Sequence, residues 1–183
     1  MMKTFKNQGF LKYVSHTALV AAVASLACAN ATAATAGASA TVIIPITITK
    51  IADLSFGKFA PGAGGTVTVN TSGTRSATGA ILSAVGSSPT AAQFDVAGDN
   101  DATYDITLTP PTDLDDGASH TMAFAGFSEV GSAPTGITSG NATTGTLSAS
   151  GAQSIYVGGT LTVGAAQVAG SYSGTITCTV EYN

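Results

Sequence analysis

The residues that could do nucleophilic chemistry in this sequence are its many serines and the one histidine that follows residue 33, His120. A serine nucleophile needs a base within hydrogen-bond reach and a third group that orients the base. No Gly-x-Ser-x-Gly turn stands between a strand pattern and a helix pattern, and His120 falls in a loop or at the start of a strand. We therefore expect no enzymatic activity and no catalytic residues, with His120 exposed to solvent.

Two groups of acidic residues have the short spacing that calcium sites use, one around Asp99 and Asp101 and one at Asp113, Asp115 and Asp116. Calcium takes about six to eight oxygen ligands, often from closely spaced carboxylates. Neither group matches a complete calcium loop, and Asp side chains also stabilise turns by accepting hydrogen bonds from nearby backbone. Turn formation is the favoured interpretation and calcium binding is the alternative, so we expect no metal site and no cofactor.

The N-terminal segment has the pattern of a secretory signal peptide, which we place at residues 1–33. Three lysines precede the apolar run 18–27, and small residues typical of a cleavage site follow the run. Cys28 raises the alternative of lipid attachment, although the leucine stands one place too close to it for that motif. The run is shorter than the roughly 20 residues that a bilayer requires, and no later stretch is longer. We expect a secreted, extracellular chain without a transmembrane segment after cleavage.

Charge and cysteine content narrow the possible partners of the mature chain. The full sequence has a net charge of −4, and removal of Lys3, Lys6 and Lys12 with the leader changes it to −4 − 3 = −7. A chain without a basic patch cannot neutralise phosphates, so nucleic-acid binding is not expected. Cys178 then has no partner for an internal disulfide, and its place in an apolar pattern predicts a small buried side chain.

The elements that must position any site are read from alternating apolar and polar residues, the pattern of a half-buried strand. The stretch 170–183 alternates throughout, which puts Tyr172, Cys178 and Tyr182 on one face. The stretch 40–49 alternates as well and puts Val42, Ile44, Ile46 and Ile48 on one face. Pro45 lacks an N–H group, so this strand should lie at a sheet edge or pair on one side only.

Between these two stretches, shorter runs predict strands near residues 66–70, 80–85, 92–97, 103–109, 121–127, 145–149 and 154–163. We interpret 112–117 as a polar loop, 128–145 as a long exposed loop, and Gly158–Gly159 as a bulge or bend. About eight to ten strands at this spacing predict an all-β, antiparallel, immunoglobulin-like sandwich. The domain is placed at residues 51–183, with residues 34–50 as an N-terminal strand before it.

Three motifs carry a resemblance that covers most of residues 38–183: Asp53-Leu-Ser-Phe-Gly57, Val157-Gly-Gly-Thr-Leu-Thr-Val163, and Gly170-Ser-Tyr-Ser-Gly174 with a penultimate tyrosine at 182. Together they look like an uncharacterised family of secreted bacterial β-sandwich proteins. Those proteins in turn resemble pilin subunits of chaperone–usher fimbriae and spore-coat-type secreted domains. The chain departs from many pilins in having no early disulfide, which puts the export route in question.

The resemblance implies a structural subunit of a surface fibre whose neighbour supplies a missing strand. It implies self-association, with a periplasmic chaperone and an outer-membrane usher as further partners. In this reading the strand-exchange residues are Val42, Ile44, Ile46, Ile48, Tyr172 and Tyr182. Two alternatives stay open from the residues themselves. The N-terminal strand either completes its own sheet or that of a neighbour, and the chain is either a fibre subunit or a monomeric, adhesin-like binding module.

Overall fold

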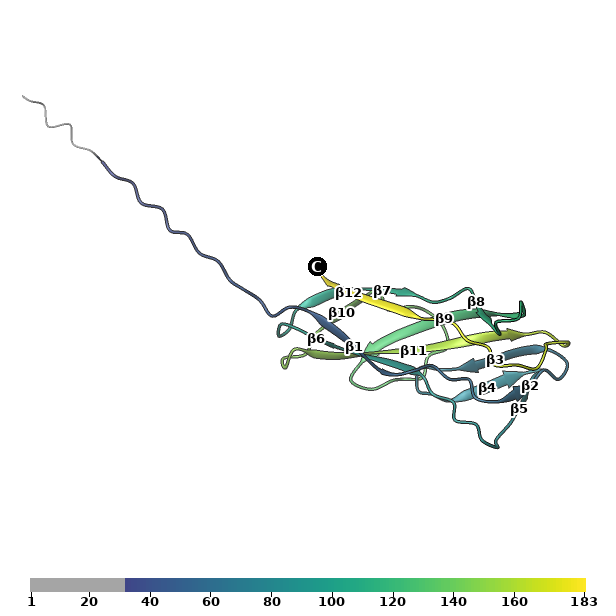
Figure 1. Ribbon diagram of the computed structural model, residues 1–183. Helices are drawn as coiled ribbons and strands as arrows, with labels where there is room; N and C mark the ends of the chain where they lie inside the picture. Colours follow the sequence, from purple (N-terminus) through teal and green to yellow (C-terminus); the bar gives the residue numbers. More distant parts are fainter. Residues whose placement is uncertain (1–31) are drawn as a thin grey trace, which may run out of the picture. The chain divides into compact units, whose positions relative to one another are not determined.

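The structure is a computed structural model that describes residues 32–183, and these residues form twelve β-strands and no helix (Figure 1). The chain divides into two units, Met1–Thr41 and Val42–Asn183, and the second is called the domain below. Residues 32–41 of the first unit contain no strand. The predicted signal peptide and Cys28 lie outside the described residues, except for positions 32 and 33 of the leader.

The larger sheet of the domain is built around one long strand, β11 (Ala152–Val163). One edge of β11 pairs first with β6 and then with β3, and its other edge pairs with β9, all antiparallel. The remaining members extend this sheet outward, so that β1 and β4 end one side and β8 ends the other. The bounds are β1 Thr47–Ala52, β3 Gly65–Val69, β4 Arg75–Thr78, β6 Ala92–Ala97, β8 Asp113–Asp115 and β9 Thr121–Gly131.

A smaller sheet in the order β10–β7–β12 lies over one half of the larger sheet, which makes the domain a sandwich (Figure 1). Its strands are β7 (Thr103–Thr109), β10 (Thr144–Thr146) and β12 (Thr177–Tyr182). A third, two-stranded sheet pairs β2 (Phe59–Ala60) with β5 (Ile81–Leu82). The all-β antiparallel sandwich predicted from the sequence is confirmed.

The first core cluster fills the space between the two main sheets. Phe94, Val96, Ile155 and Val157 face inward from the larger sheet, and Tyr104 and Ile106 face them from β7, with Cys178 on β12. The Tyr104 hydroxyl donates a hydrogen bond to Oε1 of Gln153 at 2.7 Å. Burial, together with the nearby Cys178 sulfur, raises the pKa of Tyr104 to about 12.

Cys178 behaves as the sequence predicted, as a small buried side chain. It is 9% exposed and has no disulfide partner among the described residues. Burial raises the pKa of its thiol to about 11, so the reactive thiolate is scarce at neutral pH.

The second core cluster lies beyond the end of the smaller sheet. Its buried members come from the larger sheet and from one segment beside it: Phe56, Val67, Val69, Met122, Phe124, Leu161 and Val163. Strand β7 ends at Thr109 and β12 begins at Thr177, so no strand of the smaller sheet faces the whole of this cluster. Irregular segments around residues 54–61 and 167–176 cover it instead.

The first strand is shorter and later than predicted. It begins at Thr47 instead of Ala40 and runs to Ala52, paired with β6 of its own sheet. Val42 and Ile44 are 96% and 55% exposed, respectively. The prediction of a strand over 40–46 was wrong for the isolated chain because an alternating pattern forms a strand only where a neighbour supplies hydrogen bonds. The expected edge position of this strand is confirmed, since within residues 32–183 β1 pairs only with β6.

The last strand is also shorter than predicted, beginning at Thr177 instead of Gly170. Tyr172 and Gly174 therefore lie outside it, in an irregular segment joined to β8 by the isolated bridge between Ser173 and Asp115. The same bridge and β8 correct the prediction that 112–117 is entirely loop. Residues 128–131 likewise belong to β9, and 144–146 form β10, at the two ends of the predicted long loop.

Gly158 and Gly159 do not form a bulge in the ladder with β9, which keeps its register from Ser154 to Leu161. A Cβ at Gly158 would overlap the Phe127 ring, and one at Gly159 would overlap the Phe124 ring. The two glycines lie where the opposite edge of β11 changes its partner from β6 to β3. They are required because aromatic rings of β9 pack directly onto this backbone.

We predict that Gly159→Ala lowers the free energy of unfolding by about 1–3 kcal/mol, because the added methyl group must displace the buried Phe124 ring. Gly164→Ala is the matched control, since a Cβ there meets only a flexible glutamine oxygen at 3.7 Å. Urea denaturation followed by circular dichroism measures both. Equal stability of the two variants would contradict this account of Gly159.

Candidate binding groove

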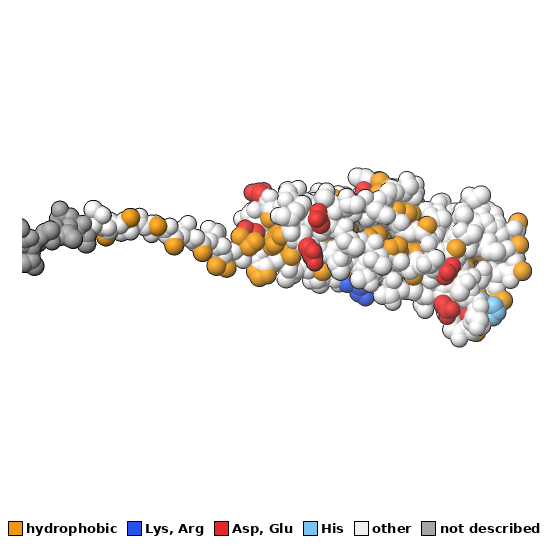
Figure 2. All heavy atoms as spheres, turned by 90° about the horizontal axis from the view of Figure 1, so that it is seen from above, with side chains coloured by type: hydrophobic (Ala, Val, Ile, Leu, Met, Phe, Trp, Pro, Cys, Tyr) orange, Lys and Arg blue, Asp and Glu red, His pale blue; other side chains and the backbone are white. Residues whose placement is uncertain are grey.

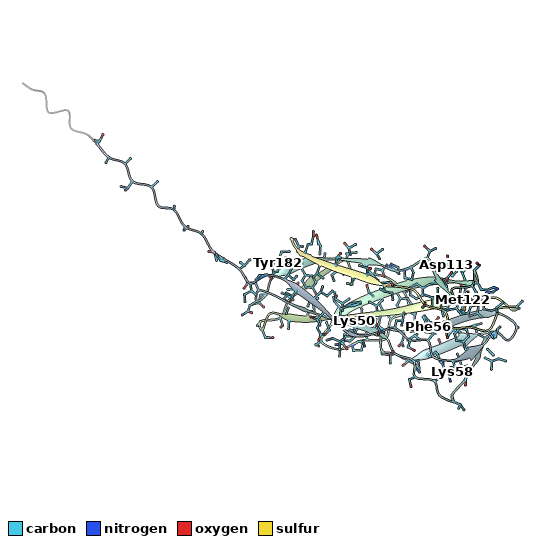
Figure 3. All side chains as sticks on the ribbon, viewed as in Figure 1. Lys50, Phe56, Lys58, Asp113, Met122 and Tyr182 are labelled. Atoms are coloured by element: carbon cyan, nitrogen blue, oxygen red, sulfur yellow. The ribbon has the colours of Figure 1, made fainter. Side chains whose placement is uncertain are left out.

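An open groove of about 590 Å³, lined by both apolar and polar residues, lies over the second core cluster. One wall is the segment 54–61 that follows β1, and the other is the segment 167–176 that precedes β12. Figure 3 shows Phe56 and Met122 in the part of the domain away from Tyr182. The apolar lining residues are Leu54, Phe56, Phe59, Leu114, Met122, Phe124, Leu161, Tyr172 and Ile176.

The floor of the groove is the second core cluster itself. The rings of Phe56 and Phe124 meet edge to face, with centroids 6.1 Å apart and planes at 87°. Met122 and Leu161 lie beside them and are 4% and 1% exposed. Among the described lining residues Lys58 is the one that is charged, and Ser55, Gln167 and Ser171 add polar groups to the apolar floor.

The first wall is held in place by the Arg75 guanidinium, which reaches across from β4. Its Nη1 donates to the carbonyl oxygens of Phe56 at 2.6 Å and Lys58 at 3.0 Å, and to the Ser87 hydroxyl at 2.9 Å. Its Nη2 donates to the Ser83 carbonyl at 2.8 Å. Gly57 between the two bonded carbonyls has a φ of +65°, and a Cβ there would overlap the Ser87 hydroxyl. Arginine can make this set of contacts because its donors form a rigid planar fork.

The second wall is held by the Gln167 and Tyr172 side chains and by backbone bonds to β8. Nε2 of Gln167 donates to the Thr121 carbonyl at 3.2 Å and to the Tyr172 hydroxyl at 2.8 Å. That hydroxyl donates to the Val168 carbonyl at 2.8 Å. Ser173 and Asp115 exchange two backbone hydrogen bonds of 2.9 Å. Both walls are thus fixed by hydrogen bonds, and on the second wall the bonded side chains Gln167 and Tyr172 also line the groove.

The structure separates the six residues predicted for strand exchange into three groups. Tyr172 lines the groove, and Ile46, Ile48 and Tyr182 are half-buried against the first core cluster of the same chain. Val42 and Ile44 are exposed. Only Tyr172 of the six is therefore part of the groove.

The sequence pattern places the floor residues Met122, Phe124 and Leu161 in strands and indicates no functional role for them. Their signal in the sequence was weak because alternating apolar residues predict any buried sheet face. The Leu54-Ser-Phe56-Gly57 motif was the better indication, since it supplies one wall of the groove. Its geometry depends on Arg75, which is distant in sequence.

The acidic turn at residues 115–120 is held by its own carboxylates. Asp115 accepts the Gly117 N–H, and Asp116 accepts those of Ala118 and His120 at 2.8 and 3.0 Å. His120 Nδ1 lies 2.7 Å from Oδ2 of Asp116 and is solvent-exposed. Desolvation opposes ionisation of Asp116, but the backbone bonds and His120 outweigh it and hold its pKa below the ordinary value. The predicted turn role of Asp115 and Asp116 is confirmed.

Within residues 32–183, no group of three or more His, Cys, Asp or Glu side chains has an arrangement that could hold a metal ion. On the face in Figure 2, acidic side chains lie toward both ends of the domain instead of gathering in one patch. No helix in the described part of the chain is long and apolar enough to cross a membrane.

The loop after β9 is anchored by a single carboxylate, that of Glu129. It accepts hydrogen bonds from the hydroxyls of Thr71 and Thr135 and from the backbone N–H groups of Thr135 at 2.8 Å and Gly136 at 3.2 Å. Desolvation raises the pKa of Glu129, but these four donors outweigh it, so the net pKa is below its ordinary value. The loop is therefore fixed to the domain.

Comparison with known proteins gives one match. The profile of the family described as Domain of unknown function (DUF4402) matches residues 46–182, which is three quarters of the chain and spans β1 to β12. No curated protein and no solved structure shows a significant similarity to this chain.

We predict that Arg75→Lys lowers the free energy of unfolding by about 2–3 kcal/mol, because one ammonium group cannot satisfy three carbonyls and a hydroxyl on two segments. Lys50→Gln is the control, since Lys50 makes only an exposed ion pair with Asp53 and should change stability by less than about 1 kcal/mol. Chemical denaturation gives both values. A loss of stability that is no larger for Arg75→Lys than for the control would contradict the role of Arg75 in holding the first wall.

The carboxylate of Glu129 also predicts how the stability of the domain changes at acidic pH. Since the folded-state pKa of Glu129 is depressed, its contribution to stability is present above its ordinary pKa of 4.5 and is lost as pH falls through the folded value. Thr135→Val should therefore reduce the drop in stability below about pH 4.5, because it removes one of the hydrogen bonds that stabilise the ionised form. Thr138→Val, in the same loop, is the control. Melting temperatures measured from pH 7 to pH 2 should show the change for Thr135→Val alone.

Proposed function

The chain belongs to the family Domain of unknown function (DUF4402), and we propose that it is a structural subunit of an extracellular bacterial fibre. Subunits join when the segment 34–44 of one copy, called the arm below, adds as a β-strand to the domain of another. The observation that carries this proposal is the open groove over the second core cluster, between the segments 54–61 and 167–176.

Two strands next in the chain to the groove walls, β1 and β12, lie at sheet edges and could offer the hydrogen-bonding groups that an added strand requires. Among the described residues, β1 pairs only with β6 and β12 pairs only with β7. An unpaired edge is a ready template for another strand, and such addition joins backbone hydrogen bonding with side-chain pockets. An extended segment placed in the groove would lie against the floor formed by Phe124 and Leu161.

The arm has the alternation that such a strand needs. Positions 34, 36, 38 and 40 are alanine, followed on the same face by Val42 and Ile44, while the other face is mostly Thr, Gly and Ser. Burial of Val42 and Ile44 against a groove would stabilise the contact by about 1.5–3 kcal/mol each. Ile46 and Ile48 already pack in their own domain. The donor face therefore ends at Ile44.

Export by the predicted signal peptide gives an extracellular fibre whose main partner is another copy of this chain. Unpaired sheet edges and exposed apolar residues such as Val42 are an aggregation hazard before assembly, so a periplasmic chaperone that covers them, and an outer-membrane usher that receives the subunit, are the further partners we propose. The absence of an early disulfide leaves packing to stabilise the domain.

A second candidate function is a monomeric, adhesin-like binding module that is secreted or exposed on the cell surface. It is favoured by the pairing of β1 within its own sheet, which leaves the domain folded without a neighbour's strand. In that case the groove itself would take an apolar ligand, while the loop anchored by Glu129 would present a fixed surface.

The test is a pair of arm variants in the secreted full chain. Val42→Asp combined with Ile44→Asp charges the donor face and should abolish SDS-resistant ladders on unheated gels and fibres in electron micrographs. Ile43→Asp charges the opposite face of the arm and should leave both at wild-type levels. A fluorescent peptide of residues 34–44 should also bind a domain that begins at Pro45, as measured by anisotropy.

Ladders that persist in the double variant would rule out the arm as the donor. A wild-type chain that is monomeric at all concentrations, with no peptide binding, would reject the fibre function and favour the binding module.

A further inference from the structure

The Tyr182 hydroxyl, on edge strand β12, binds the segment that leads into edge strand β1, at the end of the domain that is remote from the groove. It donates a hydrogen bond to the Ile44 carbonyl at 2.8 Å and accepts one from the Asp99 backbone N–H at 2.6 Å. The first contact holds the residue at which the arm ends, and the second holds the turn after β6. Figure 3 places Tyr182 in the part of the domain opposite Phe56 and Met122.

The hydroxyl occupies a close-fitting site formed by neighbouring backbone. Gly98 is buried, and a Cβ at this position would overlap the Tyr182 hydroxyl and contact Leu147. The Gly98 N–H donates to the Gly151 carbonyl at 2.9 Å, which fixes the backbone that forms the site. The ring of Tyr182 is half-buried against the first core cluster. Three separate elements thus converge on one hydroxyl group.

The position of this contact bears on where the arm can go. Strand β1 runs from the Tyr182 end toward Leu54 in the groove wall, so the arm joins the domain at the end of β1 that is farther from the groove. To enter its own groove, the chain would have to reverse near residues 44–47 and run back beside β1. That reversal would break the hydrogen bond between Ile44 and Tyr182.

The residues at this point are also poorly suited to a tight reversal. Two-residue hairpin turns need positive φ, which Gly, Asn and Asp supply. Residues 43–46 are Ile-Ile-Pro-Ile, in which the isoleucines are β-branched and proline is fixed at negative φ. Both the contact and the sequence therefore oppose self-insertion.

We propose that Tyr182 is a latch that keeps the arm out of the groove of its own chain and so commits it to a second copy. The inference rests on the proposed fibre function and adds the residue that decides between intramolecular and intermolecular strand addition. Tyr182 is in this sense a positioning residue, because it fixes Ile44, the last residue of the arm, without lining the groove.

The test compares Tyr182→Phe with the wild-type full chain. Loss of the hydrogen bond to the Ile44 carbonyl should raise the ratio of self-inserted monomer to polymer by roughly three- to tenfold. A self-inserted monomer is recognised by an arm that resists protease, measured as the intact mass of the monomer fraction after brief digestion. Hydrogen exchange at the Asp99 amide should become faster in the variant, which reports the broken latch directly.

Two further variants sharpen the result. Pro45→Asn with Ile46→Gly, added to Tyr182→Phe, supplies turn residues and should convert most of the chain to protease-resistant monomer. Tyr156→Phe removes a tyrosine hydroxyl elsewhere in the domain and should assemble as the wild type does.

Polymer yield in Tyr182→Phe and in the triple variant equal to that of the wild type would overturn the latch and leave the fibre function intact. Failure of the wild-type chain itself to polymerise would overturn both proposals, which distinguishes the two failures.

Discussion

The burial of strand β11 is the interaction on which the rest of the domain depends. Its inward residues Ile155 and Val157 belong to the first core cluster, and Leu161 and Val163 belong to the second. Its two edges pair with β6, β3 and β9, so one strand joins the pieces of the larger sheet. The glycines at 158 and 159 allow aromatic rings to pack onto its centre. A strand in this position has a buried inward face and no free edge over most of its length.

The groove follows from a mismatch in strand length. Strand β11 has 12 residues and so spans about 40 Å, whereas β7 with 7 residues spans only about 23 Å. The smaller sheet therefore cannot face the whole of β11, and the uncovered part is closed only by irregular segments. Hydrogen bonds hold those segments, from Arg75 on one wall and from Gln167 on the other. The groove persists because its walls are held by these bonds and do not depend on packing across it.

The few polar side chains of the interior are used to fix backbone. Within the described residues, every buried side-chain nitrogen or oxygen atom has a hydrogen-bond partner. Arg75, Glu129 and Tyr182 each bind two or more segments that are distant in sequence. In a chain with so few charged residues, these contacts decide which irregular segments are held and where the N-terminal segment leaves the sheet.

The sequence by itself determined the all-β class, the antiparallel sandwich, the position of β6 and β7, and the buried state of Cys178. These follow from local alternation, which depends on which face of a strand is apolar. Only the tertiary structure decided that β1 begins at Thr47, that Tyr172 lies outside the last strand, and that Phe56, Met122 and Leu161 meet in one groove. The end of a strand depends on whether a neighbouring strand supplies hydrogen bonds, and a groove depends on which segments pack over the core. An alternation with a period of two residues carries no information about either.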